Sequence, residues 1–340
     1  MGTVTGTATG SSTGRVLVAV DGGGSKTDVV ALGLDGAVLA TARGAGSCPQ
    51  VVGVGPAVAV VDGLVREVLD RLGRPDDAVE LAGVYLSGLD LPVEIETFRD
   101  AVADLGWVRA ARRGVVVEND TFALLRAGTD AREAVAVVCG TGINAVARRA
   151  DGATVRFPAL GRISGDWGGG ADLGEWALWH AARAVDGRGP WTVLVDLVPR
   201  ALGRPDVATL VEDLHLGRLG HEALAELPPV LFAAAADGDA VAASVVDRQG
   251  DEVVALATAA LRRLDLLGAD VPVVLGGGVL AAGDARLIGQ VTAGLAARAP
   301  GARVRVVTAP PVLGTALLVL EAVDAGPAAL DRACAALTSP

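Results

Sequence analysis

The sequence predicts an α/β protein made of two like domains, and three observations support this. A buried, β-branched strand at Val16–Val20 runs into the glycine turn Gly22–Gly24, and strand character resumes at Val29. The same unit recurs where the strand Ala134–Cys139 runs into the turn Gly140–Gly142. Alternating helix and strand signals follow each unit, and 340 residues are enough for two cores. An internal repeat of this kind indicates two copies of one fold.

In the first copy, three strands precede an alternation of helices and strands. The turn Asp35-Gly36 joins the second strand to the third, and residues 44–49 are expected to form a loop. Apolar residues in the stretch 54–72 recur on one face of a helix. The expected strands are Val16–Val20, Asp28–Leu34, Val38–Thr41, Leu81–Leu86 and Gly114–Val117, and the helices are Val54–Leu72, Pro92–Leu105 and Thr121–Ala127.

The second copy is longer, because several helices are expected between its third and fourth strands. The domains are expected at 15–131 and 132–340, with the last helix free to pack back on the first domain. Residues 1–14 form an uncharged Thr/Gly/Ser tail that is expected to be disordered. The expected strands are Ala134–Cys139, Ile143–Arg149, Thr154–Phe157, Val271–Leu275 and Val304–Thr308, and the helices include Asp172–Asp186, Arg286–Arg298 and Pro311–Val323.

Composition narrows the class of protein. Hydrophobic residues make up 51% and charged residues 20%, which is typical of a globular protein. A net charge of −11 argues against nucleic acid or an anionic membrane as a partner. No signal peptide or membrane-length apolar run is visible, so a cytoplasmic location is expected. Cys48, Cys139 and Cys334 are scattered and odd in number, which excludes a disulfide framework or a CxxC metal site.

The first glycine turn has the composition of a phosphate site. Backbone amides of Gly23 and Gly24 and the side chains of Ser25, Lys26 and Thr27 suit phosphate. Asp21 at its mouth suits Mg²⁺, held through water. The strand that follows distinguishes the turn from a P-loop, which opens a helix. Lys26 is the only lysine in the chain. The alternative is an ordinary glycine-rich hairpin.

Two further glycine turns end buried strands. Gly140, Thr141 and Gly142 nearly match a dinucleotide fingerprint, but a strand follows, which rejects the Rossmann interpretation. Gly276, Gly277 and Gly278 match only loosely, without the acid expected about twenty residues later. Together the three turns favour nucleotide binding more strongly than any one of them.

Three aspartates are candidates for catalysis or binding, two at the ends of strands and one in a glycine-rich segment. Asp120 ends a strand before a helix, and we expect it to accept a hydroxyl proton, although it could instead cap the helix. Asp90 has the same placement and could cap the helix beginning at Pro92. Asp166 lies among glycines and could be a turn residue. No His, Cys or Asp spacing suggests zinc, and Trp176 and Trp179 are expected in the core.

These motifs, taken in order, resemble the BadF/BadG/BcrA/BcrD ATPase family, which contains N-acetylglucosamine kinases and belongs to the actin/hexokinase/Hsp70 superfamily. The resemblance covers about residues 16–323. It implies two ribonuclease H-like domains of the actin-like ATPase fold, with ATP, Mg²⁺ and a sugar in a cleft between them. The motifs are Asp21–Thr27, Ser87–Asp90, Asn119-Asp120, Gly140–Asn144, Gly165-Asp166 and Gly276–Gly278.

The resemblance also implies roles for individual residues. Asp120 matches the catalytic aspartate that contacts the 6-hydroxyl of the sugar, and Asp166 matches a sugar-binding aspartate. Asp21 with the turn that follows resembles the first phosphate motif, Thr141 and Gly142 the second, and Gly276–Gly278 the adenosine motif. The remaining expected sugar-binding residues are Cys48, Asp90, Asn119, Asn144 and Gly161.

The chain departs from the family pattern on the sugar side. Cys48 stands where the sugar kinases usually have Asn, Ala159–Gly161 where they have Gly-Trp-Gly, and Trp167 where they have Glu. A thiol makes only weak hydrogen bonds, and an indole would add an apolar face. These changes predict an acceptor that lacks the acetamide group of N-acetylglucosamine, such as glucosamine or a plain hexose.

The leading hypothesis is an ATP-dependent kinase acting on a hydroxyl of a hexose or amino sugar, expected as a homodimer. The second is a BadF-type ATPase that activates a dehydratase through an iron–sulfur cluster, for which the scattered cysteines do not supply the ligands. The third is a sugar-sensing regulator, for which the residues before the first strand are too few and uncharged.

Overall fold

The computed structural model describes residues 14–338, so almost all of the tail expected at 1–14 lies outside the described residues. The chain divides into two compact units, residues 14–123 with 309–338 and residues 124–308. The first division falls inside a helix, a few residues before the expected boundary at 131/132. The second division returns the last two helices to the first unit.

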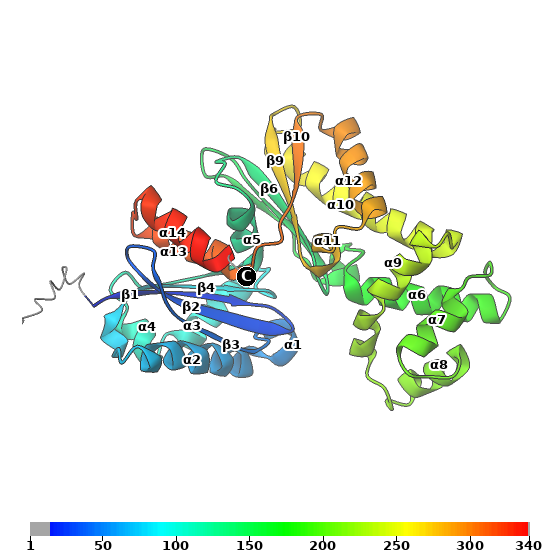
Figure 1. The fold of residues 1–340 in the computed structure, drawn as a ribbon, viewed down its shortest axis with the longest axis horizontal. Coiled ribbons are helices and arrows are strands. Elements are labelled where there is room, and N and C mark those ends of the chain that lie inside the picture. The colour runs from blue at the N-terminus through cyan, green and yellow to red at the C-terminus, as the bar shows by residue number, and fades with distance from the viewer. Residues whose placement is uncertain (1–13, 339–340) are drawn as a thin grey trace, which may run out of the picture. The chain divides into compact units, whose positions relative to one another are not determined.

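The first unit contains a five-stranded mixed sheet in the order β3-β2-β1-β4-β5 (Figure 1). β1 pairs antiparallel with β2 and parallel with β4, so the hairpin and the α/β part share one sheet. Its strands are β1 (Val16–Gly22), β2 (Lys26–Gly33), β3 (Val38–Ala45), β4 (Val79–Leu86) and β5 (Val115–Asn119). Its helices are α1 (Pro49–Val52), α2 (Val54–Arg71), α3 (Pro92–Val102), α4 (Gly106–Ala110), α13 (Val312–Ala322) and α14 (Pro327–Thr338); α5 (Asp120–Gly128) begins in it.

Both faces of this first sheet are covered, which explains its uninterrupted apolar strands. Side chains alternate along β1, so Val18 packs against α2, α3 and α4, while Leu17 packs against α13 and α14. Figure 1 shows α13 and α14 on the face opposite α2. α13 therefore packs on the first sheet, and α14, which the sequence analysis missed, packs beside it.

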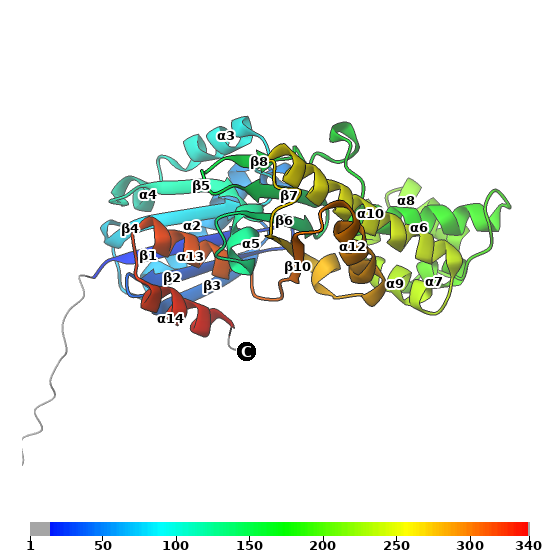
Figure 2. The ribbon, with the colours of Figure 1, turned by 90° about the horizontal axis from the view of Figure 1, so that it is seen from above.

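The second unit repeats the strand order of the first, read as β8-β7-β6-β9-β10. α10 and α12 lie along its sheet (Figure 2), and α7 and α8 lie beyond α6 (Figure 1). Its strands are β6 (Ala134–Cys139), β7 (Ile143–Arg148), β8 (Thr154–Arg156), β9 (Val271–Gly276) and β10 (Ala302–Val306). Its helices are α6 (Gly170–Val185), α7 (Leu194–Ala201), α8 (Val207–His215), α9 (Pro228–Ala236), α10 (Ala240–Arg263), α11 (Gly278–Ala281) and α12 (Ala285–Arg298).

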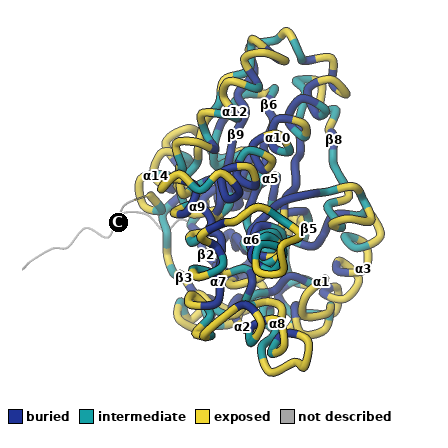
Figure 3. The backbone as a smooth tube through the Cα atoms, turned by 90° about the vertical axis from the view of Figure 1, so that its right-hand side faces the viewer, coloured by how far each residue is buried: buried dark blue, intermediate teal, exposed yellow. Residues whose placement is uncertain are grey.

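The prediction of an α/β protein with two like domains is confirmed by this repeated topology. Every residue of β9 is buried, as a strand covered on both faces requires, and Figure 3 shows β9 as a buried stretch. The described cysteines are all free thiols. Within residues 14–338, no single helix is both long and apolar enough to span a membrane. Residues 221–236 and 240–263 meet that test only as a pair, bent by 115°.

Several predicted boundaries are wrong. β3 runs on to Ala45, into the expected loop, because it keeps pairing with Lys26. The helix expected at 92–105 ends at Val102, and α4 starts after Leu105, whose backbone is extended. The last strand lies at 302–306 rather than 304–308, because it pairs in parallel with β9 from Val271 onward.

Candidate active site

The turn between β1 and β2 is short, and Gly46 from a later segment packs directly against it. Gly23 N donates to Lys26 O over 2.8 Å, which closes the hairpin. A Cβ on Gly46 would lie 2.2 Å from Gly24 O, so only glycine permits this approach. Ser47 N donates to Gly23 O over 3.0 Å. A Cβ on Gly24 itself would meet no atom within 4 Å, which leaves that side of the turn open.

The side chains after the turn point in opposite directions. Thr27 is fully buried, and its hydroxyl lies 2.7 Å from Ala45 O and 2.8 Å from Ser47 Oγ. Thr27 therefore holds the following loop, and its hydroxyl is directed into the unit. Lys26 is 52% exposed, and its Nζ lies 3.5 Å from Asp28 Oδ2. Asp28 also binds Arg43, whose Nη2 donates to Oδ2 over 3.1 Å. Ser25 is exposed.

Three aspartates gather at one edge of the first sheet. Asp21 is the last residue but one of β1, Asp90 follows β4, and Asp120 follows β5. These three strands are parallel neighbours, so their carboxyl ends meet at the same edge. Burial and the repulsion between neighbouring carboxylates both disfavour the ionised form, so the pKa values of these three aspartates are expected to rise.

The shifts follow from burial and from the neighbouring acids. Burial raises the pKa of Asp120 to about 7, against hydrogen bonds from backbone N–H groups. Burial, then the charges of Asp120 and Glu94, raises the pKa of Asp90 to about 7. Burial, then Asp120 and Asp28, raises the pKa of Asp21 well above its usual value, while Lys26 opposes this. Asp120 is thus poised to exchange a proton near neutral pH.

Asp90 is held by two amides, one of which the sequence analysis missed. Asn119 Nδ2 donates to Asp90 Oδ1 over 2.9 Å. Gln50 Nε2 donates to Asp90 Oδ2 over 3.2 Å and to Glu94 Oε1 over 2.9 Å. Nothing in the local sequence of Gln50 signals this, because its partners are 40 and 44 residues away.

The capping alternatives for the two strand-end acids are resolved by neighbouring side chains. Glu94 Oε2 accepts from Leu91 N over 2.8 Å and from Asp90 N over 2.9 Å, so Glu94 caps the start of α3. Asn119 Oδ1 accepts from Thr121 N over 3.0 Å at the start of α5. Glu94 was also missed, because the residue three positions before it is Leu91 and not the Ser, Thr, Asp or Asn of the usual capping signal.

Cys48 packs on the segment that precedes Asp90. Its thiol is buried, and a Cβ on Gly88 would lie 2.6 Å from Cys48 Sγ. The thiol therefore packs on the backbone of Gly88, which has a φ of +72°. Gln50, two residues further on, brings an amide to Asp90.

In the second unit, three glycine segments far apart in the sequence pack on one another. A Cβ on Gly277 would lie 2.5 Å from the Cys139 carbonyl, and one on Gly169 would lie 2.5 Å from Gly142 Cα. Gly170 N donates to Gly140 O over 2.7 Å. Gly140 and Gly142 have nothing within 4 Å of an added Cβ, so the turn keeps an open side. The structure therefore joins the two expected nucleotide turns and adds the segment 168–170, which the sequence analysis did not assign to them.

The aspartate expected to bind sugar in this unit lies in a tight turn. Asp166 Oδ2 accepts from Ser164 Oγ over 2.5 Å, and Asp166 N donates to Gly161 O over 3.1 Å. Gly161 is exposed with a φ of +70°. Asn144 is a buried residue of β7 whose Oδ1 accepts from Ala145 N over 2.6 Å.

Trp167 does not offer the open apolar face expected of it. Its ring is buried, and the Arg248 guanidinium lies 4.2 Å from the ring centroid. Trp176, 6.0 Å away, continues this stack and packs on the core of the second unit. Trp179, also expected in the core, is 44% exposed because it lies on the outer side of α6. The structure therefore does not support the part of the acceptor argument that rests on Trp167.

A magnesium ion held through water fits Asp21. Within residues 14–338, no group of three or more His, Cys, Asp or Glu side chains is placed to hold a metal ion. Asp21 Oδ2, however, is buried without a hydrogen-bond partner among the described residues. Mg²⁺ keeps several waters and commonly takes only one or two carboxylates together with phosphate oxygens. One carboxylate oxygen without a hydrogen-bond partner, close in sequence to the open turn at Gly24, suits that mode of binding.

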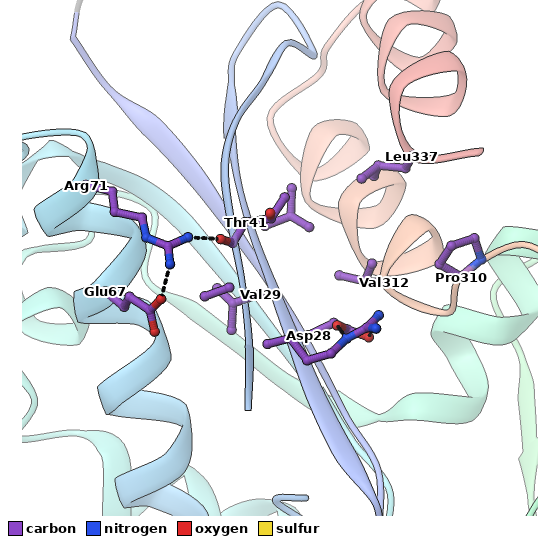
Figure 4. A pocket seen from close by; sticks show the side chains of 11 residues that line it. Asp28, Val29, Thr41, Glu67, Arg71, Pro310, Val312 and Leu337 are labelled. Carbon is purple, nitrogen blue, oxygen red and sulfur yellow. Dashed lines mark hydrogen bonds and ion pairs between the residues drawn. The ribbon is translucent and has the colours of Figure 1, made fainter. Parts of the chain in front are cut away.

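The described pocket in the first unit lies apart from these carboxylates. It has a volume of about 400 Å³ and is lined by residues of α2, β2, β3, α13 and α14 with Pro310. Figure 4 shows Arg71 directed at Glu67 and at Thr41 O, so this cation is already paired. None of the sequence-predicted site residues lines the pocket.

Two mixed five-stranded sheets of the same strand order, with glycine turns at strand ends, define an actin-like fold. The chain matches the model of the BadF/BadG/BcrA/BcrD ATPase family over residues 18–318 and belongs to that family. The resemblance identified from the motifs is confirmed.

Three similar proteins carry kinase names. N-acetylmuramic acid/N-acetylglucosamine kinase of Clostridium acetobutylicum is 26% identical over 266 residues, which is 78% of this chain and 86% of that protein. N-acetyl-D-glucosamine kinase of Dictyostelium discoideum is 24% identical over 319 residues, 90% of this chain and 98% of that protein. The crystal structure of a proposed N-acetylglucosamine kinase from Chromobacterium violaceum has a TM-score of 0.69 and 25% identity, covering 90% of this chain and 99% of that one.

Proposed function

We propose that this protein is an ATP-dependent kinase that transfers the γ-phosphoryl group to a hydroxyl of an amino sugar, with the 6-hydroxyl as the expected acceptor. The observation that carries the proposal is Asp120, whose pKa of about 7 suits a base at neutral pH, at an edge shared with Asp90 and Asp21. The names of the two relatives in sequence support a sugar as the acceptor.

Asp120 would orient the hydroxyl and accept its proton as the oxygen attacks phosphorus. Asp90, Asn119 and Gln50 form a polar group beside it that would hold the sugar hydroxyls. Phosphoryl transfer requires positioning and charge neutralisation more than covalent chemistry, so a rigid hydrogen-bonded group is suitable.

The remaining predicted residues would bind the nucleotide or the sugar. Because Gly23 N already donates to Lys26 O, the amide of Gly24 and the ammonium of Lys26 would neutralise phosphate charge in the first unit. In the second unit, the stacked turns Gly140–Gly142 and Gly276–Gly278 would hold phosphate and adenosine, and Asp166 would bind the sugar. Mg²⁺, held at Asp21 through water, would supply charge stabilisation for the transferred group.

The competing ATPase-activator hypothesis gains nothing from the structure, because Cys48 and Cys139 are buried. The acceptor stays a proposal within the amino sugars. Gln50 provides the amide that Cys48 lacks, so N-acetylglucosamine and glucosamine are both reasonable acceptors.

The test is an acceptor screen with purified protein, ATP and MgCl₂. The acceptors are N-acetylglucosamine, glucosamine, N-acetylmuramic acid and glucose, and ADP release is followed together with the mass of the product. Sugar-dependent ADP release with a phosphorylated product is expected. ADP release that no sugar accelerates would support an ATPase instead and would contradict the proposal.

A further inference from the structure

The glycine-rich segment before α6 has little conformational preference of its own. Residues 165–170 contain four glycines, and Gly165, Gly168 and Gly169 all have positive φ values. Glycine loses more conformational freedom on folding than any other residue. Contacts from elsewhere in the chain must therefore determine where this segment lies.

Gln249 of α10 makes such a contact. Its side chain is fully buried, and its Oε1 accepts a hydrogen bond from Gly169 N over 3.0 Å. A Cβ on Gly168 would lie 2.5 Å from the same Oε1. The amide of Gln249 and the backbone of residues 168–169 are thus fitted closely to one another, 80 residues apart in the sequence.

The segment that Gln249 holds in turn holds the nucleotide turn. Gly170 N donates to Gly140 O over 2.7 Å, and Ala171 N donates to Thr141 O over 3.0 Å. Gly169 packs directly on Gly142. A chain of contacts therefore leads from Gln249 through residues 169–171 to the carbonyls of the turn Gly140–Gly142.

Stability alone does not account for Gln249. Its Nε2 is buried and has no hydrogen-bond partner among the described residues. A buried amide nitrogen without a partner destabilises the folded state. An apolar side chain could fill the same space without that penalty, but it could not accept from Gly169 N.

We propose that Gln249 is a positioning residue that orients the turn Gly140–Gly142 for the nucleotide. The inference rests on the proposed function, because it assumes that this turn binds ATP. Gln249 would contact no substrate itself and would act through the backbone of residues 168–171.

The test compares Gln249→Leu with Thr258→Val, both on α10. Thr258 is likewise buried, with a hydroxyl that has no partner among the described residues, so it matches the burial and the loss of a polar group. The dissociation constant of a fluorescent ATP analogue, KM for ATP, KM for the sugar and Tm are measured for each.

Gln249→Leu is expected to raise the nucleotide dissociation constant and KM for ATP by about 3–10-fold, the range of one hydrogen bond. KM for the sugar should rise less than KM for ATP, because Gln249 holds Gly169 directly and Asp166, the proposed sugar-binding residue, lies three residues before it. Thr258→Val should leave all the binding constants unchanged. A purely structural role would lower Tm and the active fraction without this split between the two KM values.

A second variant keeps the test decisive if Gln249→Leu folds poorly. Asp172→Ala releases the same segment through a different bond, since Asp172 Oδ2 accepts from Gly168 N over 3.0 Å. It should weaken nucleotide binding in the same way. Unchanged nucleotide affinity in folded Gln249→Leu, or in Asp172→Ala where only that variant folds, overturns the inference while leaving the kinase proposal intact. A wild-type protein that binds no ATP overturns both.

Discussion

Asn119 Nδ2 donates to Asp90 Oδ1 over 2.9 Å, which links the ends of two adjacent parallel strands. Both side chains are buried. The bond favours the ionised form of Asp90, whereas burial and the charge of Asp120 disfavour it. The balance leaves two carboxyl groups that titrate near neutrality, and most of the predictions below follow from that.

Replacing Asp120 by Asn should abolish most turnover without abolishing nucleotide binding. The substitution keeps the shape and removes the base, and loss of a general base typically costs about 10²–10⁴-fold in rate. kcat and the ATP dissociation constant are measured alongside Asp104→Asn, a control at an exposed position. A near-normal kcat would transfer the role to Asp90.

Activity should rise with pH through a midpoint of about 7, the pKa of Asp120. The base must be deprotonated to accept the hydroxyl proton, so kcat/KM for the sugar should fall about tenfold per pH unit well below that midpoint. The measurement is a pH profile from 5.5 to 9 at saturating ATP. A flat profile across pH 6–8 would contradict a base with this pKa.

The raised pKa of Asp90 predicts that the Asp90→Asn variant gains the most stability over the wild type at high pH. A carboxyl whose pKa is raised on folding stabilises the protein fully below its unfolded pKa near 3.8, and this stabilisation is lost as pH rises to about 7. The neutral amide avoids that loss. Tm of the variant minus Tm of the wild type should therefore be larger at pH 8 than at pH 4.5, by a few degrees. A difference that does not change with pH would show that Asp90 titrates normally.

Lys26→Ala should weaken ATP binding without unfolding the protein, because the side chain is half exposed. Lys26 also lowers the pKa of Asp21, so its loss should leave Asp21 less charged. The matched control is Arg43→Ala, which removes the other cation from Asp28. Equal effects of the two substitutions would indicate that only the charge balance of Asp28 matters.

Gln50→Ala should impair the sugar side of the reaction rather than the ATP side. Loss of its hydrogen bonds to Asp90 and Glu94 removes one contact that keeps Asp90 ionised. KM for the sugar should rise several-fold, in line with about 0.5–1.5 kcal/mol for such a bond. Gln290→Ala is a control, since Gln290 likewise bonds a carboxylate, Asp251, at an exposed place. An unchanged sugar KM would assign Gln50 a structural role.

The sequence alone determined the features that local pattern encodes. Buried strands that end in glycines or acids identified the two copies of the fold, the three glycine turns and the strand-end aspartates. Parallel pairing then requires acids such as Asp90 and Asp120 to share one edge of a sheet. These conclusions needed only the periodicity of strands and the chemistry of the residues that follow them.

Only the tertiary structure decided which side chains meet from distant segments. Gln50 reaches Asp90, Gln249 holds Gly169, and α13 returns to the first sheet through contacts that no local pattern specifies. Trp167 is another example, because Arg248 covers a ring that the sequence analysis expected to offer an apolar face to the sugar. Local pattern determines which atoms each residue can offer, whereas packing of the whole chain determines which partners those atoms find.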